Sequence, residues 1–382
     1  MTRNLDIAWF GSSLVSAYWN GAATYYRGLI KALAGRGHRI RFFEPDAFGR
    51  QAHRDLPDPP WAEVEVYEPT GAAAARCLER AADADVIVKT SGVGVLDDVL
   101  ERGTVRLGRR GPHTVFWDVD APATLARLKA DPADPLRALV PAFGRVMTYG
   151  GGPPVVAAYE ALGARGCVPV YNALDSDTHH PVPACPEFTA SLGFLGNRLP
   201  DRDARVEGFF FDAARRLPGH RFLLGGSGWE DRAGALPNVR VLGHVYTRDH
   251  NAFNSSPLAV LNLCRDSMAA NGWSPATRVF EAAGAGACII SDRWTGIEDF
   301  LEPGGEVLVA DDGAGVARLL AALTPERAQV IGAAARRRVL AGHTYAQRAR
   351  QVEAVLLGDL GRAPVVAPAE VAAGVPAPGA VR

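Results

Sequence analysis

The sequence of 382 residues has few lysines, few cysteines and no excess of charge of either sign. Its 41 Lys and Arg residues nearly balance 42 Asp and Glu residues, which gives a formal net charge of −1. This balance argues against a protein that mainly grips nucleic acid, because such proteins carry a basic surface. No apolar run reaches the roughly 20 residues of a membrane span, and residues 1–10 do not resemble a signal peptide. We therefore expect a cytoplasmic globular protein without a transmembrane segment.

The five cysteines are too scattered for a disulfide scaffold or a cysteine-rich zinc site, since no two of them form a CxxC pair. Buried free thiols in a reducing compartment explain them better. They are Cys77, Cys167, Cys185, Cys264 and Cys288. The pattern GxGxxG is also absent, so a dinucleotide cofactor site is poorly supported.

Short apolar segments alternate with helical segments along the chain, which predicts α/β domains with parallel sheets. In the first half, we expect strands at Leu5–Phe10, Arg39–Glu44, Val64–Tyr67, Val86–Lys89, Thr114–Trp117, Val146–Tyr149 and Val168–Tyr171. In the second half, we expect strands at Ser191–Gly196, Arg221–Gly225, Val239–Leu242, Leu258–Leu263 and Cys288–Ser291. The main expected helices are Ala22–Ala34, Arg202–Leu217, Pro275–Ala285 and Pro325–Ala341.

The polar, proline-rich segment Asn172–Pro186 is the best candidate for a linker. It divides the chain into an N-terminal domain over 1–172 and a C-terminal domain over 187–344, with 173–186 as the linker. A last helix is expected at Tyr345–Leu357. The remainder, 358–382, is rich in Ala, Pro, Val and Gly without a period, which predicts a disordered tail.

Polar residues that directly follow strands are the candidates for a site, because ligands of open parallel sheets bind outside the carboxyl ends of the strands. Lys89 ends one strand, where it could contact a phosphate or an acceptor carboxylate, or be a surface lysine. Asp118 and Asp120 follow another strand, where they could supply a general base or cap the next helix. A metal site built on these two carboxylates is weaker, since no third ligand stands nearby.

Glycine-rich turns mark further places where the backbone could approach a ligand. Gly11–Ser13 follows the first strand, although an ordinary tight turn explains it equally well. Gly150–Pro154 is too flexible to be a helix and predicts a loop that passes close to something. The residues expected on the acceptor side or in the cleft are Ser12, Ser13, Asn20, Gly151 and Gly152.

The second half contains sharper signals. Gly196, Asn197 and Arg198 follow its first strand, with Arg202 and Arg205 close by, and a turn containing Gly226 follows the second strand.

A helix is expected to start at Ser274 as its cap, with Pro275 in its first turn, so its free N–H groups could hold an anion. Arg278 and Glu281 lie on one face of this helix. Either they pair with each other, or the helix start and Arg278 hold a diphosphate while Glu281 accepts hydrogen bonds from a ribose diol.

Several stretches resemble the GT-B glycosyltransferases, and more narrowly the CgeB-like, spore-maturation-type bacterial enzymes. They include SPATRVFEAAGAGACIISDRWTGIEDFLEPGGEVLVADD, VFWDVDAPATL, TYGGGPPVVAAYEALGA, SLGFLGNRLPDRDARVEGFF and RVLAGHTYAQRA. The resemblance runs from about Leu5 to Leu357. It implies two Rossmann-like domains that face each other across a cleft, with a nucleotide sugar on the C-terminal domain and an acceptor on the N-terminal one.

The resemblance also implies roles for single residues. The diphosphate would be held by Arg198 and the helix start, the ribose by Glu281, and the base would lie by His244 and Val245. The donor-binding residues expected are Gly196, Asn197, Arg198, Gly226, His244, Val245, Ser274, Ala276, Thr277, Arg278 and Glu281. The final helix would cross back onto the N-terminal domain. No bound cofactor and no metal are expected, since GT-B enzymes usually need none.

Two positions depart from the related enzymes. Retaining members have a Glu-x7-Glu motif whose second Glu aligns with Glu281, but Trp273 stands where the first is expected. A His is expected near Ala22. Retention or inversion is therefore left open.

The sequence predicts a glycosyltransferase that moves a sugar from a nucleoside diphosphate sugar to an unidentified acceptor. Asp120 is the first candidate for the base, with Asp118 and Lys89 as further catalytic candidates. The alternatives are a nucleotide-sugar epimerase of the same architecture and a catalytically inactive nucleotide-sugar-binding scaffold.

Overall fold

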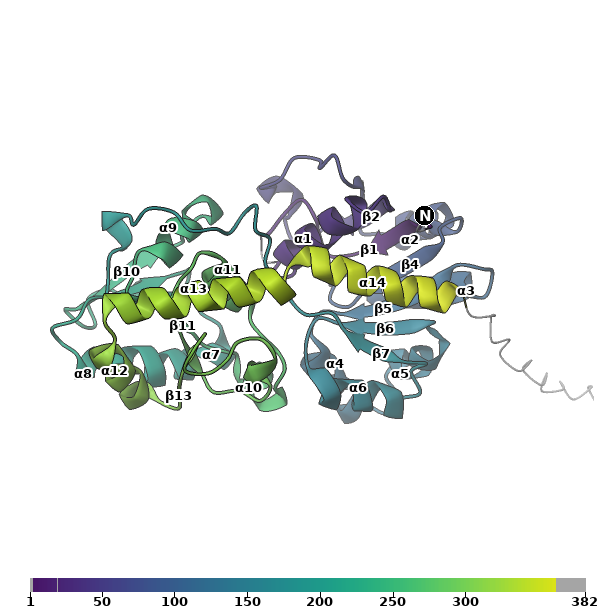
Figure 1. The fold of residues 1–382 in the computed structure, drawn as a ribbon. Coiled ribbons are helices and arrows are strands. Elements are labelled where there is room, and N and C mark those ends of the chain that lie inside the picture. Colours follow the sequence, from purple (N-terminus) through teal and green to yellow (C-terminus); the bar gives the residue numbers. More distant parts are fainter. Residues whose placement is uncertain (1–2, 19, 362–382) are drawn as a thin grey trace, which may run out of the picture.

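The computed structural model describes residues 3–18 and 20–361, which form two lobes, each built on its own parallel sheet (Figure 1). The N-terminal lobe has the strand order β3-β2-β1-β4-β5-β6-β7 and the C-terminal lobe the order β10-β9-β8-β11-β12-β13. The N-terminal strands are β1 (Asp6–Phe10), β2 (Arg39–Pro45), β3 (Glu63–Tyr67), β4 (Val86–Thr90), β5 (His113–Asp118), β6 (Arg145–Thr148) and β7 (Cys167–Pro169). The C-terminal strands are β8 (Leu192–Leu195), β9 (Phe222–Gly225), β10 (Val239–Gly243), β11 (Ala259–Asn262), β12 (Ile289–Asp292) and β13 (Leu308–Ala310).

Helices cover both faces of each sheet. The N-terminal lobe contains α1 (Ala23–Ala34), α2 (Gly71–Ala81), α3 (Asp97–Gly108), α4 (Ala121–Ala130), α5 (Pro135–Leu139) and α6 (Gly152–Ala161). The C-terminal lobe contains α7 (Pro200–Arg205), a π-helical turn (Val206–Phe211), α8 (Asp212–Arg216), α9 (His250–Ser255), α10 (Asp266–Asn271), α11 (Thr277–Gly284), α12 (Gly313–Ala322) and α13 (Pro325–Gly342).

Strand β1 shows why the strands are nearly continuous apolar runs. Ile7 and Trp9 lie in a core with α1, whereas Ala8 and Phe10 lie in a second core with α2 and α3. Successive side chains of a strand point to opposite faces, so a sheet with a core on each face needs apolar residues at every position.

The last helix, α14 (Tyr345–Leu360), begins where α13 ends and continues over the N-terminal lobe, where it packs on α1 (Figure 1). A capping box of Thr344 and Gln347 starts it. Gly28 of α1 permits a close approach, because a Cβ there would stand 2.2 Å from the ring of Tyr345. Leu174 of the linker pairs with the α13–α14 junction, so the two crossings between the lobes lie side by side.

The structure differs from the sequence-based elements at several places. Residues 150–154 were expected as a loop, but α6 begins at Gly152, because Pro153 and Pro154 suit the first turn of a helix. Helices α3, α9 and α10 and strand β13 were not predicted. Helix α14 extends to Leu360, so the expected tail starts too early; the rest of it, 362–382, lies outside the described residues.

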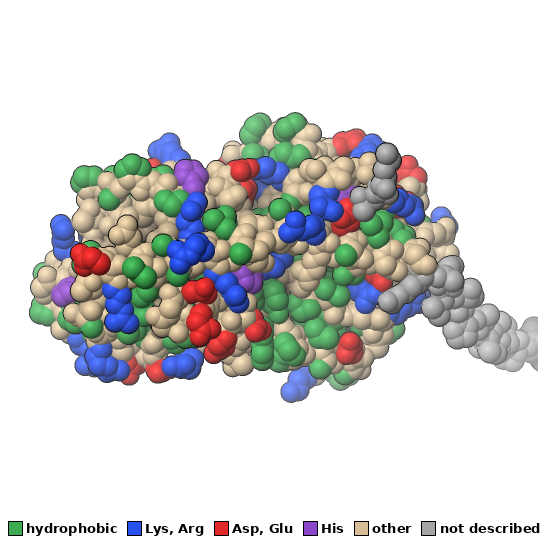
Figure 2. Space-filling model, in the orientation of Figure 1, with side chains coloured by type: hydrophobic (Ala, Val, Ile, Leu, Met, Phe, Trp, Pro, Cys, Tyr) green, Lys and Arg blue, Asp and Glu red, His purple; other side chains and the backbone are tan. Residues whose placement is uncertain are grey.

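Among the described residues, every helix is too short or too polar to cross a bilayer. On the face drawn in Figure 2, basic and acidic side chains are interspersed over both lobes, in line with the net charge near zero.

Candidate functional site

A cavity of about 630 Å³ lies between the carboxyl ends of the two sheets. Loops that follow strands form most of its wall, from both lobes. The N-terminal lobe contributes Ser12 after β1, Asn20, Ala22, Asp120 after β5, and Gly150 after β6. The C-terminal lobe contributes Gly196, Asn197, Arg202, Gly226, His244, Val245, His250, Arg265, Ser274, Ala276, Thr277, Arg278 and Glu281. The site is therefore at the place where open parallel sheets bind ligands.

Helix α11 points its N-terminus into this cavity. It begins at Thr277, with Ala276 as an N-cap whose side chain caps nothing. The expected cap Ser274 instead donates from its hydroxyl to the carbonyl of Gly272, 2.9 Å away. The first N–H groups of a helix have no intrahelical acceptor, so the α11 start offers donors and a partial positive charge to a ligand.

Two arginines line the cavity beside this helix start. The Arg278 guanidinium donates to the carbonyl oxygen of Leu195 (2.5 Å) and to Oδ1 of Asn262 (3.0 Å). Arg202 donates to the carbonyl oxygen of Asn197 (3.1 Å), and its buried Nε has no partner. Within the described part of the chain, neither guanidinium forms an ion pair. Both cations are held by neutral acceptors alone.

The electrostatics of the pair reflect this arrangement. Burial, reinforced by the neighbouring charge of Arg202, lowers the pKa of Arg278 to about 9, although Glu281 acts in the opposite direction. Burial and the charge of Arg265 likewise lower the pKa of Arg202. A shift in this direction means that the charged form lacks stabilisation, which an anion in the cavity would supply.

Arg198 does not belong to this cluster, which corrects its expected role. Its guanidinium forms ion pairs with Asp203 (2.8 Å) and Asp231 (2.9 Å) and lies over the ring of Trp229. These partners hold it outside the cavity wall, and Arg202 takes the position expected for it.

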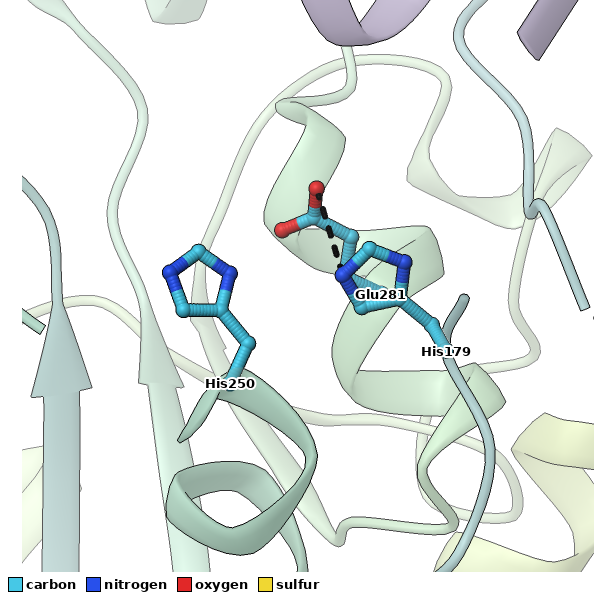
Figure 3. Close-up of side chains that lie close together, drawn as sticks. All are labelled: His179, His250 and Glu281. Carbon is cyan, nitrogen blue, oxygen red and sulfur yellow. Dashed lines mark ion pairs between the residues drawn. The ribbon is translucent and has the colours of Figure 1, made fainter. Parts of the chain in front are cut away.

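Glu281 lies one turn into α11 and faces two histidines (Figure 3). The expected alternative of an Arg278–Glu281 pair is wrong, because the donors of Arg278 go to Leu195 and Asn262. The imidazole of His179 lies beside Glu281, with Nε2 3.8 Å from Oε1. Burial lowers the pKa of His250, opposed by the charge of Glu281. No motif in the sequence indicates that His179 and His250 meet here.

Asp120 stands at the N-cap position of α4, but its side chain makes no capping hydrogen bond. It is half-exposed and lies 3.5 Å from Nη1 of Arg265, whose Nε donates to Asp201 (2.7 Å). Arg265 thus links the N-terminal Asp120 to the C-terminal lobe across the cavity. A carboxylate placed in this way can accept a proton from a ligand in the cavity.

Asp118 is wrong as a catalytic candidate, because it is fully buried. Its carboxylate accepts hydrogen bonds from Ser91 (2.6 Å), Thr124 (3.0 Å), the N–H of Asp120 (3.0 Å) and the hydroxyl of Tyr159. Burial raises its pKa, and these donors oppose the shift. The residue organises the loop after β5.

Lys89 is also wrong as a cleft residue, since its side chain is 0% exposed. Its Nζ donates to Asp97 (2.7 Å) and to the carbonyl of Thr90 (2.6 Å), and lies 3.7 Å from Glu101. Asp97 and Glu101 belong to α3, so the lysine fixes that unpredicted helix to the end of β4.

The expected cleft residues of the N-terminal lobe divide into two groups. Ser12 and Asn20 line the cavity and bond to each other (2.9 Å), whereas Ser13 is buried against Glu44 (2.8 Å). Gly151 and Gly152 lie beside the cavity rather than in its wall.

These two glycines contact the segment before α11. The N–H of Gly151 donates to the carbonyl of Trp273 (2.7 Å), and a Cβ on Gly152 would stand 2.5 Å from the Trp273 ring. The close approach that was expected of this turn is therefore an approach to the C-terminal lobe.

The two positions that depart from the expected motifs differ in location. Ala22 lines the cavity, whereas Trp273 is absent from its wall and donates from Nε1 to Asp299 (2.7 Å). Trp273 adopts a positive φ of 42°, which is unusual for a bulky residue. It therefore supports the approach to α11 rather than a ligand.

Comparison with known proteins adds a match to a family model over part of the chain and a fold shared with solved structures. Residues 202–354 match a family model described as glycosyl transferase-like, and this segment contains Arg202, Arg278 and Glu281. The search of curated proteins finds no match.

Solved structures with a similar fold include sucrose-phosphate synthase from Thermosynechococcus elongatus, at 14% identity, a TM-score of 0.68, and coverage of 93% of this chain and 99% of that chain. Anabaena HepE in complex with UDP and glucose matches at 15% identity and a TM-score of 0.66, over 93% of this chain and 100% of that chain. The lipopolysaccharide outer core galactosyltransferase WaaB matches at 13% identity and a TM-score of 0.59, over 93% and 99%. The predicted GT-B fold is confirmed.

Proposed function

We propose that the chain is a glycosyltransferase of the GT-B type, which its matched segment and its fold support, and that it moves a sugar from a nucleoside diphosphate sugar to an acceptor in the same cavity. The finer parts of this proposal are a CgeB-like subtype, a cytoplasmic location, a C-terminal domain over 187–344 that holds the donor, and catalysis without a metal. HepE, which shares the fold, has been solved with UDP-glucose.

The observation that carries the proposal is that two guanidiniums beside the start of α11 have no ion-pair partner within the described residues. Arg202 and Arg278 have neutral acceptors only, and the first N–H groups of the helix are uncapped. A diphosphate offers several anionic oxygens, which suit planar guanidinium donors and a helix N-terminus. It would also remove the cost of burying two cations next to each other.

The rest of the donor would lie along the C-terminal wall. Glu281 accepts no hydrogen bond within the described residues, and a ribose diol has two hydroxyl donors for its two oxygens. The nucleobase would occupy the end lined by His244 and Val245, which follow β10. This order places the sugar toward the N-terminal lobe.

Transfer breaks the bond between the sugar and the diphosphate and forms a bond from the sugar to an acceptor hydroxyl. Arg202, Arg278 and the α11 N–H groups would stabilise the negative charge that develops on the leaving diphosphate. Asp120 would take the proton of the acceptor hydroxyl. Arg265, which bridges Asp120 and Asp201, would hold that carboxylate in position.

Calorimetric titration of a panel of nucleoside diphosphates tests the donor site. Charged hydrogen bonds contribute roughly 1.5–3 kcal/mol, so Arg202→Gln should weaken binding about 10- to 150-fold. Arg198→Gln is the matched control, because Arg198 follows the same strand and is held outside the cavity by Asp203 and Asp231. The proposal fails if the two variants have equal affinity, or if the unmodified protein binds no nucleoside diphosphate.

Acceptor-dependent transfer separates this activity from the epimerase and scaffold alternatives. Nuclear magnetic resonance of the donor alone would detect epimerisation, whereas a transferase needs the acceptor for product. Release of diphosphate that depends on an added acceptor supports the proposal, and donor conversion without one contradicts it.

A further inference from the structure

Three potential metal ligands from distant parts of the chain meet at the cavity, and two of them, His250 and Glu281, lie in its wall. His179 comes from the linker between the lobes, His250 is the first residue of α9, and Glu281 lies in α11. One ligand atom of each lies within 4.8 Å of the others. In Figure 3 both imidazole rings turn a nitrogen toward Glu281.

The hydrogen bonding of His250 leaves its inner nitrogen as an acceptor. Nε2 lies 3.3 Å from the carbonyl oxygen of Val245. A carbonyl can only accept, so Nε2 carries the proton and Nδ1 of the neutral ring has a free lone pair. Nδ1 is buried and has no hydrogen-bond partner.

The same reasoning applies to His179. The hydroxyl of Thr178 donates to the carbonyl of Asp175 (3.1 Å), so its oxygen accepts from Nδ1 of His179 (2.9 Å). Nε2 of the neutral ring is therefore unprotonated. His179 is only 4% exposed, and Nε2 has no hydrogen-bond partner.

Three acceptors thus converge without a donor between them. The carboxylate of Glu281 accepts no hydrogen bond within the described residues, and the unprotonated Nε2 of His179 lies 3.8 Å from its Oε1. Lone pairs that face one another at low exposure repel, and buried polar groups of this kind require a partner. A cation placed between them would satisfy all three.

We propose that His179 Nε2, His250 Nδ1 and the Glu281 carboxylate bind a divalent transition-metal ion of the zinc type. Two imidazoles and one carboxylate form a donor set that zinc uses in proteins, whereas Mg²⁺ and Ca²⁺ prefer oxygen alone. Zinc ligands stand about 2.0–2.2 Å from the ion, so the cluster needs to contract by roughly 1 Å.

The surroundings meet two further requirements of a metal site. Each histidine donates its outer N–H to a fixed acceptor, the Thr178 hydroxyl or the Val245 carbonyl, as ligating histidines do. His250 and Glu281 also line the cavity, which gives the ion a path of entry and an open coordination position.

A metal here would compete with the donor substrate. This part of the inference rests on the proposed function, in which Glu281 accepts hydrogen bonds from the ribose diol. A carboxylate that ligates a metal cannot also bind the diol in the same way, so the ion acts as a competitive inhibitor at the nucleotide site and not as a catalytic cofactor.

Titration of the full chain with Co²⁺, followed by its visible ligand-field absorption, and with Zn²⁺, followed by calorimetry, tests the site. We expect binding of one ion to the unmodified protein. His179→Ala and His250→Ala should each weaken it by at least the roughly 10- to 100-fold that loss of an outer partner of a metal ligand costs. His180→Ala is the matched control, because His180 is the exposed neighbour of His179 and its ring contacts only the carbonyl of Pro181 within the described residues. The backbone N–H of His180, which donates to Asn251, is kept in this variant.

A milder variant keeps the test valid if the alanine variants unfold. Thr178→Val removes the acceptor of His179 Nδ1 while the ligands stay, and should weaken metal binding about 10- to 100-fold. The inference is overturned if the unmodified protein shows no tetrahedral Co²⁺ absorption, or if the absorption persists in His179→Ala at equal affinity.

Nucleotide titrations with and without a chelator distinguish this inference from the proposed function. With the chelator, His179→Ala should retain nucleoside diphosphate binding, and Glu281→Ala should lose it about 10- to 150-fold. Zn²⁺ should weaken nucleotide binding more in the unmodified protein than in His179→Ala. The nucleotide itself also binds Zn²⁺, but it does so equally in both titrations, so this effect does not alter the comparison. Equal inhibition in both proteins contradicts the competition, and failure to bind nucleotide under any condition contradicts the proposed function alone.

Discussion

The two lobes place charged groups at the same kind of position and satisfy them in opposite ways. In the N-terminal lobe, the buried Lys89 at the end of β4 pairs with Asp97 and Glu101, and Asp118 at the end of β5 has four donors. In the C-terminal lobe, Arg202 and Arg278 have neutral acceptors only.

This difference distinguishes charged side chains with a structural role from those that can bind a ligand. A buried charge is costly unless it is paired and hydrogen-bonded, so Lys89 and Asp118 are already stable without a substrate. Two adjacent, half-buried guanidiniums without a counter-ion are stable only because the rest of the fold tolerates them, which is typical of binding sites. A position at a strand end predicts a site. Whether a charged side chain already has a partner of opposite charge or enough hydrogen bonds decides if it belongs to that site.

The largest expected effect concerns the two aspartates after β5. If Asp120 is the base, Asp120→Asn should lower diphosphate release by roughly 10²- to 10⁴-fold while the melting temperature stays the same. Asp118→Asn is the matched control and should lower the melting temperature, because an amide N–H₂ would face the donors that now bond to Asp118. The comparison breaks down if Asp118→Asn lowers turnover at unchanged stability while Asp120→Asn has no effect.

A smaller effect is expected from removing the buried lysine. Lys89→Met leaves Asp97 and Glu101 without their cation, and breaking a buried pair in this way costs about 3–5 kcal/mol. Urea unfolding measures the loss, and nucleotide affinity of the folded variant should be unchanged. Lys31→Met is the control, since Lys31 is exposed and pairs with Asp177 on the surface, where such pairs contribute about 0–1 kcal/mol. Equal stability of the two variants would contradict the structural role of Lys89.

The sequence predicted the fold well because the fold depends on local patterns. Apolar runs such as Val86–Lys89 are long enough to mark strands, and the proline-rich segment 172–186 separates two sets of them. Helix α3 is not predicted because its buried face mixes Leu100 and Leu107 with Glu101, Gly103 and Thr104, and Glu101 is paired by Lys89 only in the folded protein. Helix α6 is not predicted because the glycines and prolines at its start are also typical of a loop.

The site was predicted less completely because the sequence does not reveal which side chains form ion pairs or tertiary contacts with one another. Arg198 and Arg202 lie four residues apart in the sequence. Only the structure reveals that Arg198 forms ion pairs with Asp203 and Asp231. His179 and His250 are brought together by the linker and α9, a tertiary contact without any motif. Glu281 and the α11 start could be predicted, because a helix N-terminus and a carboxylate one turn later follow from local spacing alone.

The smallest expected effect is a pH dependence of donor binding that only the C-terminal lobe should show. Burial and the charge of Arg202 lower the pKa of Arg278 to about 9 in the free protein, and a bound diphosphate favours the charged form. Binding should therefore be undiminished below pH 9 and weaken as the pH rises through this value, by up to about tenfold per pH unit, because each complex must then take up one proton.

Calorimetry of a nucleoside diphosphate between about pH 8 and about pH 10.5 measures this slope, and titration in buffers of different ionisation enthalpy counts the protons. Arg278→Gln should bind more weakly and lose the slope, because its amide does not titrate. The slope must come from this residue and not from loss of structure, so the unfolding free energy of the unmodified protein is measured over the same range. If the affinity of the unmodified protein does not change with pH, Arg278 is stabilised in its charged form without a ligand. Arg278 would then not differ from the paired charges of the N-terminal lobe.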